Sequence, residues 1–198
     1  MSSLCTVKEL TTRLRAGEAG LFPTDTVPAL ATTPSAAQQL WALKQRPLQK
    51  AVILMGAQAE DLWPCLGLPV EPAWRELARR HWPGALTLVL PARGPVVEQL
   101  NPGGQSLGLR VPACAEALEL LRSSGPLATT SANRSGDPAC SSAAEAAVAF
   151  PTVARLGPLP WPTASGQAST VLAWTPTGHW ELLRAGAVPA PTDALGPL

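Results

Sequence analysis

Charge is scarce in this sequence. Only 15% of its 198 residues are Asp, Glu, Lys or Arg, and the formal net charge is +1. A nearly neutral chain has no long-range attraction for nucleic acid, although a local basic groove stays possible. The hydrophobic content of 46% excludes a disordered chain, because disorder requires less apolar surface and more net charge. We expect one compact domain, since this length is enough for one sizeable core.

The sequence also lacks paired cysteines and long apolar runs. Cys5, Cys65, Cys114 and Cys140 form no C-x-x-C pair, which excludes a zinc knuckle and a redox motif of that type. The N-terminus has no basic region followed by an apolar run, so no signal peptide is expected. Reduced thiols and a cytoplasmic location follow as expectations. No stretch approaches the roughly 20 apolar residues needed to span a bilayer, so we expect a soluble protein.

Several catalytic motifs are missing as well. His81 and His179 have no acid or nucleophile at motif spacing, which argues against a catalytic triad. The sequence contains no G-x-x-x-x-G-K-[ST], so ATP would have to bind without a P-loop. The seven tryptophans are scattered, and packing explains them better than nucleobase stacking does.

Apolar runs typical of strands alternate with stretches of helical periodicity, which predicts an α/β fold. Helices are expected at about 6–15, 35–44, 59–62, 72–81, 113–122 and 142–150. Strands are expected at about 19–22, 51–55, 86–90, 107–111, 127–130, 169–174 and 180–184. Thr6 and Ser142 each begin a capping box, and Ser35 is the expected cap of the second helix. The Pro- and Ala-rich residues after Gly186 are expected to be frayed.

Three cations fall within seven residues, at Lys44, Arg46 and Lys50, although no residue between Asp25 and Lys44 carries a formal charge. They follow a predicted helix that Pro47 is expected to end, so they occupy a helix-to-strand turn. Such turns border binding crevices in α/β proteins, and the concentrated positive charge predicts an anion site. Complementation of the helix dipole on a solvated turn explains the same cations and stays open as an alternative.

Clusters of small polar residues are expected just after apolar strands, at 24–26, 129–133 and 169–170. We expect these clusters to meet at one edge of the sheet, where ligands bind in open α/β proteins. With the cations they would form a site of hydroxyls and positive charge with few carboxylates. Such a site suits phosphates and a carboxylate rather than carboxylate-based acid–base hydrolysis. Turn formation and capping alone also explain the polar residues at 24–26 and 131–133.

Arg110 stands inside the apolar strand predicted at 107–111. A buried, unpaired cation costs several kcal/mol, roughly the penalty estimated for desolvated ions. Arg110 therefore needs a partner, which is either another residue of the chain or a bound ligand.

Six short motifs in one order carry a resemblance to a known family. They are Pro23-Thr24-Asp25-Thr26-Val27, Lys44-Gln45-Arg46-Pro47, Trp82-Pro83-Gly84, Gly108-Leu109-Arg110-Val111-Pro112, Ser131-Ala132-Asn133-x-Ser135-Gly136 and Ser169-Thr170-Val171. Each motif alone is weak, whereas six in the same order are specific. From about Leu4 to Gly186 the chain strongly resembles the YrdC-type threonylcarbamoyl-AMP synthases.

The resemblance implies a fold and a reaction. The fold is a single YrdC-like catalytic domain at 1–186, with a twisted, mixed β-sheet flanked by helices around a central positively charged cavity, and a Pro/Ala-rich tail at 187–198. The reaction makes L-threonylcarbamoyl-adenylate and pyrophosphate from L-threonine, bicarbonate or CO2, and ATP. Mg2+ would arrive on the triphosphate with water and phosphate ligands, without a protein metal site. A partner transferase would then use the adenylate to make N6-threonylcarbamoyladenosine (t6A) in tRNA, with weak or indirect tRNA contact by this chain.

The resemblance also assigns roles to individual residues. The ATP side is assigned to Lys44, Arg46, Lys50, Ser131, Asn133 and Arg184, with Lys44 and Arg46 as the catalytic cations. The threonine side is assigned to Thr26, Arg110, Thr129 and Ser169, and Arg110 is the expected partner of the threonine carboxylate.

Two positions depart from the family pattern. Pro28-Ala29 replaces the usual Tyr-Gly, and Met55 stands where some relatives have a histidine near threonine. Both departures concern the amino-acid pocket, so a carbamoyl-adenylate enzyme acting on another amine is one alternative. The other alternative is an RNA-binding module for tRNA or ribosomal RNA precursors, which the net charge of +1 disfavours.

Overall fold

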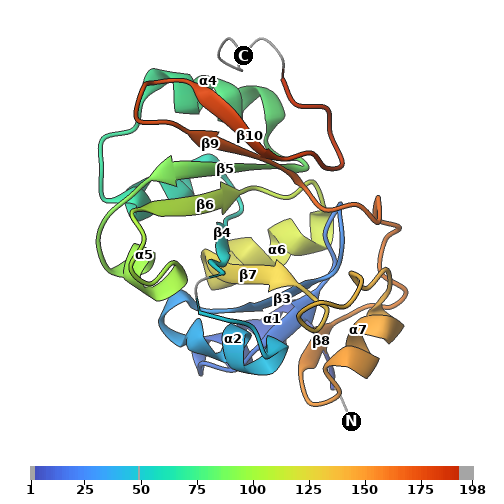
Figure 1. Ribbon diagram of the computed structural model, residues 1–198. Helices are drawn as coiled ribbons and strands as arrows, with labels where there is room; N and C mark the ends of the chain where they lie inside the picture. Colours follow the sequence, from blue (N-terminus) through green and yellow to red (C-terminus); the bar gives the residue numbers. More distant parts are fainter. Residues whose placement is uncertain (1–2, 49, 192–198) are drawn as a thin grey trace.

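A ten-stranded mixed sheet organises the part of the chain that the computed structural model describes, residues 3–48 and 50–191 (Figure 1). The spatial order of the strands is β1-β8-β2-β3-β7-β4-β6-β5-β9-β10. The strands are β1 (Leu4–Cys5), β2 (Gly20–Phe22), β3 (Ala29–Thr32), β4 (Ile53–Met55), β5 (Leu86–Pro91), β6 (Ser106–Arg110), β7 (Leu127–Ser131), β8 (Ala154–Leu156), β9 (Thr170–Trp174) and β10 (Trp180–Arg184). β1 and β10 are therefore the two edge strands.

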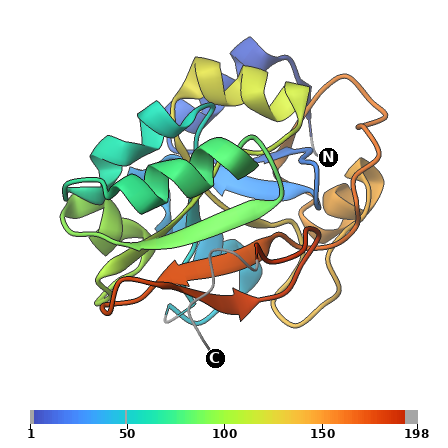
Figure 2. The same cartoon turned by 90° about the horizontal axis from the view of Figure 1, so that it is seen from above.

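Helices flank this sheet. They are α1 (Val7–Arg15), α2 (Gln38–Lys44), α3 (Ala59–Leu62), α4 (Pro72–His81), α5 (Pro95–Leu100), α6 (Ala115–Ser124) and α7 (Ala143–Ala149), with 3₁₀ turns η1 (Pro34–Ala36) and η2 (Trp63–Leu66). Helices α1 and α6 lie side by side (Figure 2) and bury Leu10, Leu14 and Leu120 in one apolar cluster. Leu40 of α2 and Leu77 of α4 belong to a second, larger cluster. The predicted α/β fold with a mixed sheet is confirmed.

All seven predicted strands exist, with ends shifted by at most two residues, and three further strands among the described residues were not predicted. Strand β3 pairs antiparallel with both β2 and β7 although its sequence is Ala-Leu-Ala-Thr. Alanine is depleted in strands, so position in the sheet overrides local propensity here. Strand β8 lies between Pro151 and Pro158, at the start of a segment that is rich in proline, and it pairs with β1 and β2. Helix α5 was also not predicted.

The ends of α2 differ from the prediction. Ser35 lies inside the turn η1 and does not cap α2, whose N-cap residue Ala37 makes no side-chain cap bond. At the other end, Gln45 adopts φ 51° and ψ 47°, the left-handed conformation that commonly ends a helix. The helix thus ends before Pro47, because a left-handed residue breaks the repeating hydrogen bonds.

Strands β5 and β6 present different kinds of residue on the two faces of the sheet. Leu86 and Leu88 of β5 and Leu109 of β6 enter the larger core cluster. Successive side chains of a strand point to opposite faces of the sheet. The alternation therefore places Thr87 and Arg110 on the face opposite these leucines, although both side chains are buried.

A buried lysine joins the end of α2 to the loop after β7. The Lys44 ammonium donates to the backbone oxygens of Ser131 and Asn133, both at 2.5 Å, and to Asn133 Oδ1 at 3.2 Å. In return, the loop supplies donors to the helix end, because Arg134 Nη1 bonds Leu43 O at 2.7 Å and the Ser135 amide bonds Lys44 O at 3.1 Å. The last carbonyls of a helix lack partners within the helix, so this reciprocal set of bonds stabilises both segments.

Residues 187 and 188 are not frayed, contrary to the prediction for the tail. The Ala187 amide bonds Ala168 O at 2.8 Å, and the Thr170 hydroxyl bonds Val188 O. The rest of the predicted tail, from residue 192, lies outside the described residues. All four cysteines are free thiols, as predicted. In the described part of the chain, no helix is long and apolar enough to cross a membrane.

Lys44→Met is expected to lower the free energy of unfolding by roughly 1–3 kcal/mol, because it leaves buried oxygens without their donor. Urea unfolding followed by circular dichroism measures the change. Lys50→Met is the matched control, since Lys50 is exposed, and it should shift stability by less than about 0.5 kcal/mol. Equal stability of the two variants would contradict the structural role of Lys44.

Candidate active site

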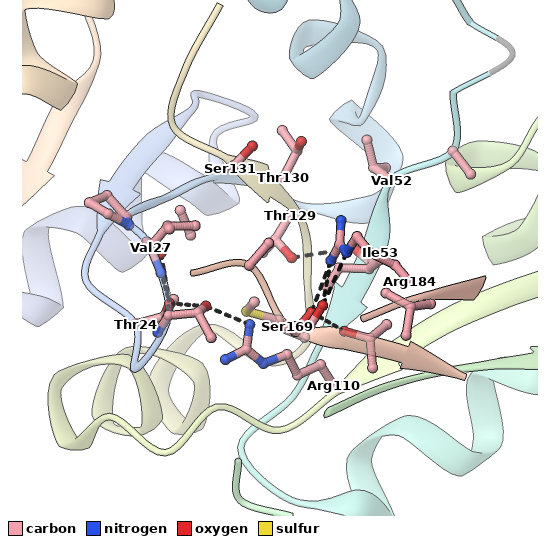
Figure 3. Close-up of a pocket in the computed structure, with 18 of the residues that line it drawn as sticks. Thr24, Val27, Val52, Ile53, Arg110, Thr129, Thr130, Ser131, Ser169 and Arg184 are labelled. Carbon is pink, nitrogen blue, oxygen red and sulfur yellow. Dashed lines mark hydrogen bonds between the residues drawn. The ribbon is translucent and has the colours of Figure 1, made fainter. Parts of the chain in front are cut away.

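A cavity opens on the face of the sheet opposite the leucines of β5 and β6 (Figure 3). It is lined by Thr24, Thr26, Val27, Pro28, Ala29, Arg46, Ala51, Val52, Ile53, Met55, Thr87, Val89, Arg110, Thr129, Thr130, Ser131, Ala168, Ser169, Val171 and Arg184. Three of these residues are arginines, and none is a carboxylate. Hydroxyl groups line much of the remainder, so the cavity offers positive charge and neutral hydrogen-bonding groups.

The location corrects the expectation of a site at one edge of the sheet. Alternate residues of single strands line the cavity, such as Thr87 and Val89 of β5 or Ile53 and Met55 of β4. Strands β5 and β6 are antiparallel, so their carboxyl ends cannot share an edge. The cluster at 169–170 also lies at the start of β9 rather than after a strand. The polar clusters meet across a sheet face instead.

Arg110 is buried at the wall of this cavity, with 3% of its surface exposed. Its Nη2 lies 2.6 Å from Asp25 Oδ1, its Nη1 donates to Thr26 Oγ1 at 2.8 Å, and its Nε donates to Gly84 O at 3.1 Å. Burial lowers the pKa of Arg110, and the Asp25 charge opposes this shift. The required partner of Arg110 is thus internal, and two of the five N–H groups of a guanidinium remain for a ligand.

The Thr24–Thr26 turn is closed by hydrogen bonds of its own hydroxyl groups. Thr24 Oγ1 donates to Val27 O at 2.7 Å and accepts from the Thr26 amide at 3.1 Å. The two threonine hydroxyls lie 3.0 Å apart, and either can be the donor. Thr26 Oγ1 also accepts from Arg110 Nη1, so this hydroxyl joins the turn to the guanidinium. The predicted turn is present, and both threonines line the cavity.

Arg46 also lines the cavity. Its Nη1 donates to Thr130 Oγ1 at 2.9 Å, and its Nη2 donates to Ala51 O at 2.6 Å. The Nε atom is buried and has no protein partner among the described residues. Burial lowers the pKa of Arg46. Nη1 and Nη2 each keep a second N–H, and a guanidinium with such donors beside a polar cavity is suited to an anionic ligand.

Arg184 and Ser169 form a third polar group on the cavity wall (Figure 3). Arg184 Nη2 donates to Ser169 O at 2.8 Å and to Ser169 Oγ at 3.2 Å. The Ser169 hydroxyl also lies 2.8 Å from Thr87 Oγ1 on β5. The buried Thr87 hydroxyl therefore helps to fix the position of Ser169.

Ser131 lines the cavity, and Asn133 and Lys44 are hydrogen-bonded to it. Ser131 Oγ donates to Asn133 Oδ1 at 2.5 Å, and the ammonium of Lys44, the last residue of α2, donates to the same loop. Burial lowers the pKa of Lys44 to about 8, and the nearby charge of Arg46 adds to the shift. A solvated turn that only complements the helix dipole does not describe Lys44, because 3% of this residue is exposed.

The structure brings together most of the residues predicted for the site. Seven of them line the cavity, namely Thr26, Arg46, Arg110, Thr129, Ser131, Ser169 and Arg184. Lys44 and Asn133 lie behind Ser131 and bond to it. Lys50 is exposed and does not line the cavity.

Three polar contributors received no individual role from the sequence, although Asp25 and Thr130 lie in the polar clusters predicted at 24–26 and 129–133. Asp25 pairs with Arg110, Thr87 contacts Ser169, and Thr130 accepts from Arg46. A signal existed for Thr87, because it is the one polar residue in the apolar run 86–90. The pairing of Asp25 with Arg110 joins residues 85 positions apart, and no local pattern reveals such a contact.

The residues at both departures from the family pattern, Pro28, Ala29 and Met55, line the cavity. Pro28 lies two residues after the Thr24–Thr26 turn, and its ring makes the backbone of the cavity wall stiff at this point. In the described part of the chain, no group of three or more His, Cys, Asp or Glu residues could hold a metal ion.

Comparison with known proteins assigns the chain to a family. Residues 12–186 match the Sua5/YciO/YrdC family model, described as telomere recombination. The chain is 35% identical to threonylcarbamoyl-AMP synthase of Neisseria meningitidis over 138 residues, which are 67% of this chain and 72% of that protein. It is also 35% identical to threonylcarbamoyl-AMP synthase of Bacillus subtilis, over 81% of this chain and 47% of that protein.

Solved structures agree with this assignment. P. abyssi Sua5 in complex with L-threonine superposes with a TM-score of 0.84 at 30% identity, over 96% of this chain and 58% of that chain. This chain therefore spans less than two thirds of Sua5. E. coli YciO is similar in fold, with a TM-score of 0.83 at 21% identity over 98% of this chain and the whole of that chain. On the family match and these relatives, the chain belongs to the Sua5/YciO/YrdC family.

Proposed function

We propose that the protein is an L-threonylcarbamoyladenylate synthase, which makes threonylcarbamoyl-AMP and pyrophosphate from L-threonine, bicarbonate or CO2, and ATP. Relatives from N. meningitidis and B. subtilis bear the name of this activity, and a similar Sua5 structure contains L-threonine. The observation that carries the proposal is the buried Arg110 guanidinium at the wall of a cavity that also holds Arg46 and Arg184.

The threonine half of the proposed site surrounds Arg110. The two uncommitted N–H groups of Arg110 would bind the substrate carboxylate. Thr26 Oγ1 would hydrogen-bond the substrate amine or hydroxyl, because it lines the cavity beside Arg110. Thr129 and Ser169 would complete this half, with Thr87 fixing the Ser169 hydroxyl. Pro28 and Met55 would limit the space beside the side chain of the amino acid.

The ATP half would lie between Arg46, Arg184 and the loop at Ser131. Arg46 would bind phosphate oxygens through the second N–H groups of Nη1 and Nη2, because Nε is buried. All three N–H groups of Lys44 already have acceptors, so Lys44 would act through its charge and by holding Ser131 and Asn133 in place. Lys50 would contribute from outside the cavity, at the exposed end of the same turn.

The reaction needs no protein nucleophile. The substrate amine adds to CO2 and loses a proton, which gives a carbamate. A carbamate oxygen then attacks the α-phosphorus of ATP, a P–O bond forms, and the bond to the β-phosphate breaks with release of pyrophosphate. The arginines would bring two anions together and stabilise the charge that develops on the phosphate, so positioning and electrostatics supply the rate.

Mg2+ is expected to accompany the nucleotide. It would neutralise charge on the triphosphate and would be held by phosphate and water oxygens. This fits a cavity lined by hydroxyls and arginines without Asp or Glu.

The wider context is part of the proposal. Residues 1–186 would form the catalytic domain, and the residues after them a C-terminal tail. The adenylate would pass to a transferase that modifies tRNA, with indirect tRNA contact by this chain. The four free thiols and the tRNA substrate of the pathway fit a cytoplasmic location.

Release of pyrophosphate from ATP is expected to require L-threonine and bicarbonate together, because the attacking carbamate forms from both. A coupled pyrophosphate assay with each component omitted in turn measures this. Release that is indifferent to threonine but stimulated by another amine would favour a carbamoyl-adenylate enzyme of different specificity. Tight, strongly salt-dependent RNA binding without any turnover would instead favour the RNA-binding module.

Arg110→Lys is expected to raise the KM for threonine about tenfold or more and to change the KM for ATP by less than about threefold. The substitution keeps a cation beside Asp25 but removes the donors left for a carboxylate, and a charge-assisted hydrogen bond contributes roughly 1.5–3 kcal/mol. Steady-state kinetics with each substrate varied in turn tests this.

Arg46→Ala is expected to produce the reverse pattern, with the KM for ATP raised about tenfold or more, because the phosphates lose a guanidinium partner. Arg122→Ala is the matched control, since Arg122 is exposed on α6 and does not line the cavity. If Arg46→Ala changed only the KM for threonine, the proposed division of the cavity would be wrong.

A further inference from the structure

We propose that Asp25 is a positioning residue, which holds the Arg110 guanidinium in the orientation that receives the carboxylate of the amino-acid substrate. The inference rests on the proposed function and adds a residue that does not line the cavity. Asp25 contacts Arg110 directly and would not touch the substrate.

The geometry places Asp25 behind the site. Its Oδ1 lies 2.6 Å from Arg110 Nη2, and the two side chains are 15% and 3% exposed. Arg110 lines the cavity and Asp25 does not. The carboxylate therefore contacts the guanidinium from a side that the substrate would not occupy.

Three acceptors fix the plane of the guanidinium, because each binds a different nitrogen. Asp25 takes a proton of Nη2, Thr26 one of Nη1, and Gly84 O that of Nε. Among them only Asp25 carries charge. An ionic partner gives a shorter and stronger hydrogen bond than a neutral one, so Asp25 is expected to dominate the orientation.

The position of Asp25 is itself fixed by the backbone. Asp25 O accepts from the Ser165 amide at 3.1 Å, and Thr26 O accepts from the Gly166 amide at 2.9 Å. Within the turn, Thr24 Oγ1 accepts from the Thr26 amide at 3.1 Å. A carboxylate on a turn held from two sides can set an angle for its partner, which a mobile surface carboxylate cannot do.

The presence of a second arginine, Arg184, in the same cavity gives the Asp25 charge a role beyond stabilising the fold. Arg184 also carries positive charge in this cavity, and its charge acts on Arg110 together with that of Asp25. Asp25 offsets this repulsion, so that both arginines can face one small space. The ion pair thus compensates for the burial of the Arg110 charge and also allows Arg110 and Arg184 to lie at the same cavity.

The test compares Asp25→Asn with wild type in kinetics and in binding. We expect the KM for L-threonine to rise at least tenfold, with the KM for ATP within twofold of wild type. Isothermal titration supplies a second readout, namely the ratio of affinities for L-threonine and L-threoninamide, which differ in the carboxylate. This ratio is expected to fall at least fivefold in the variant, because the amide does not depend on the orientation of Arg110.

Two further variants distinguish the effect of the position of the Asp25 carboxylate from the effects of its charge and of protein stability. Asp25→Glu keeps the charge but displaces the carboxylate, and it is expected to raise the KM for threonine as well; it also serves if Asp25→Asn does not fold. Glu18→Gln is the matched control, because it breaks the exposed Arg13–Glu18 pair of 3.0 Å, and it should leave both KM values within twofold of wild type.

Several results would overturn the proposal. One is an unchanged KM for threonine in the folded variants, with only the maximal rate and the thermal stability lowered, which is the pattern of a structural residue. Another is a lower KM, which would mean that Asp25 competes with the substrate for Arg110. Failure of the proposed function is distinguishable, because wild type itself would then show no threonine-dependent turnover and no preference for threonine over the amide.

Discussion

The buried Arg110 is the constraint on which the rest of this site depends. A guanidinium inside a sheet is tolerated only when its charge and its N–H groups have partners. The chain provides a carboxylate, a hydroxyl and a carbonyl oxygen through Asp25, Thr26 and Gly84. These partners use three of the five donors. The protein therefore stabilises the cation and still keeps binding capacity at the wall of the cavity.

Polar groups can line a cavity on one face of the sheet because successive side chains of a strand point to opposite faces. Leucines of β5 and β6 fill the core on one face of the sheet, and each intervening position points to the other face. Polar residues can then occupy that second face without disturbing the core. Hydroxyls from β5, β7 and the start of β9 consequently meet the arginines over a single cavity. The site is thus built on rigid strands, which fixes the positions of its polar groups.

The fold class and most of the elements could be predicted from periodicity, because apolar spacing differs between helices and strands. Strand β3 could not be predicted, since its alanines acquire strand structure only between β2 and β7. The placement of the site was wrong in one respect, because the sequence does not reveal which strands run antiparallel. Ordered motifs identified the family, whereas the Asp25–Arg110 pair depends on a contact across 85 positions.

The turn at Lys44 shows how one group of residues divides its roles. Lys44 is buried and joins two segments of the chain, Arg46 lines the cavity, and Lys50 is exposed.

The central claim is that this cavity joins an amino-acid carbamate to AMP. Incubation with ATP, L-threonine and 13C-bicarbonate, followed by mass spectrometry, tests it most directly. The account predicts threonylcarbamoyl-AMP that carries one 13C atom, and an adenylate without the label, or no adenylate at all, would contradict it.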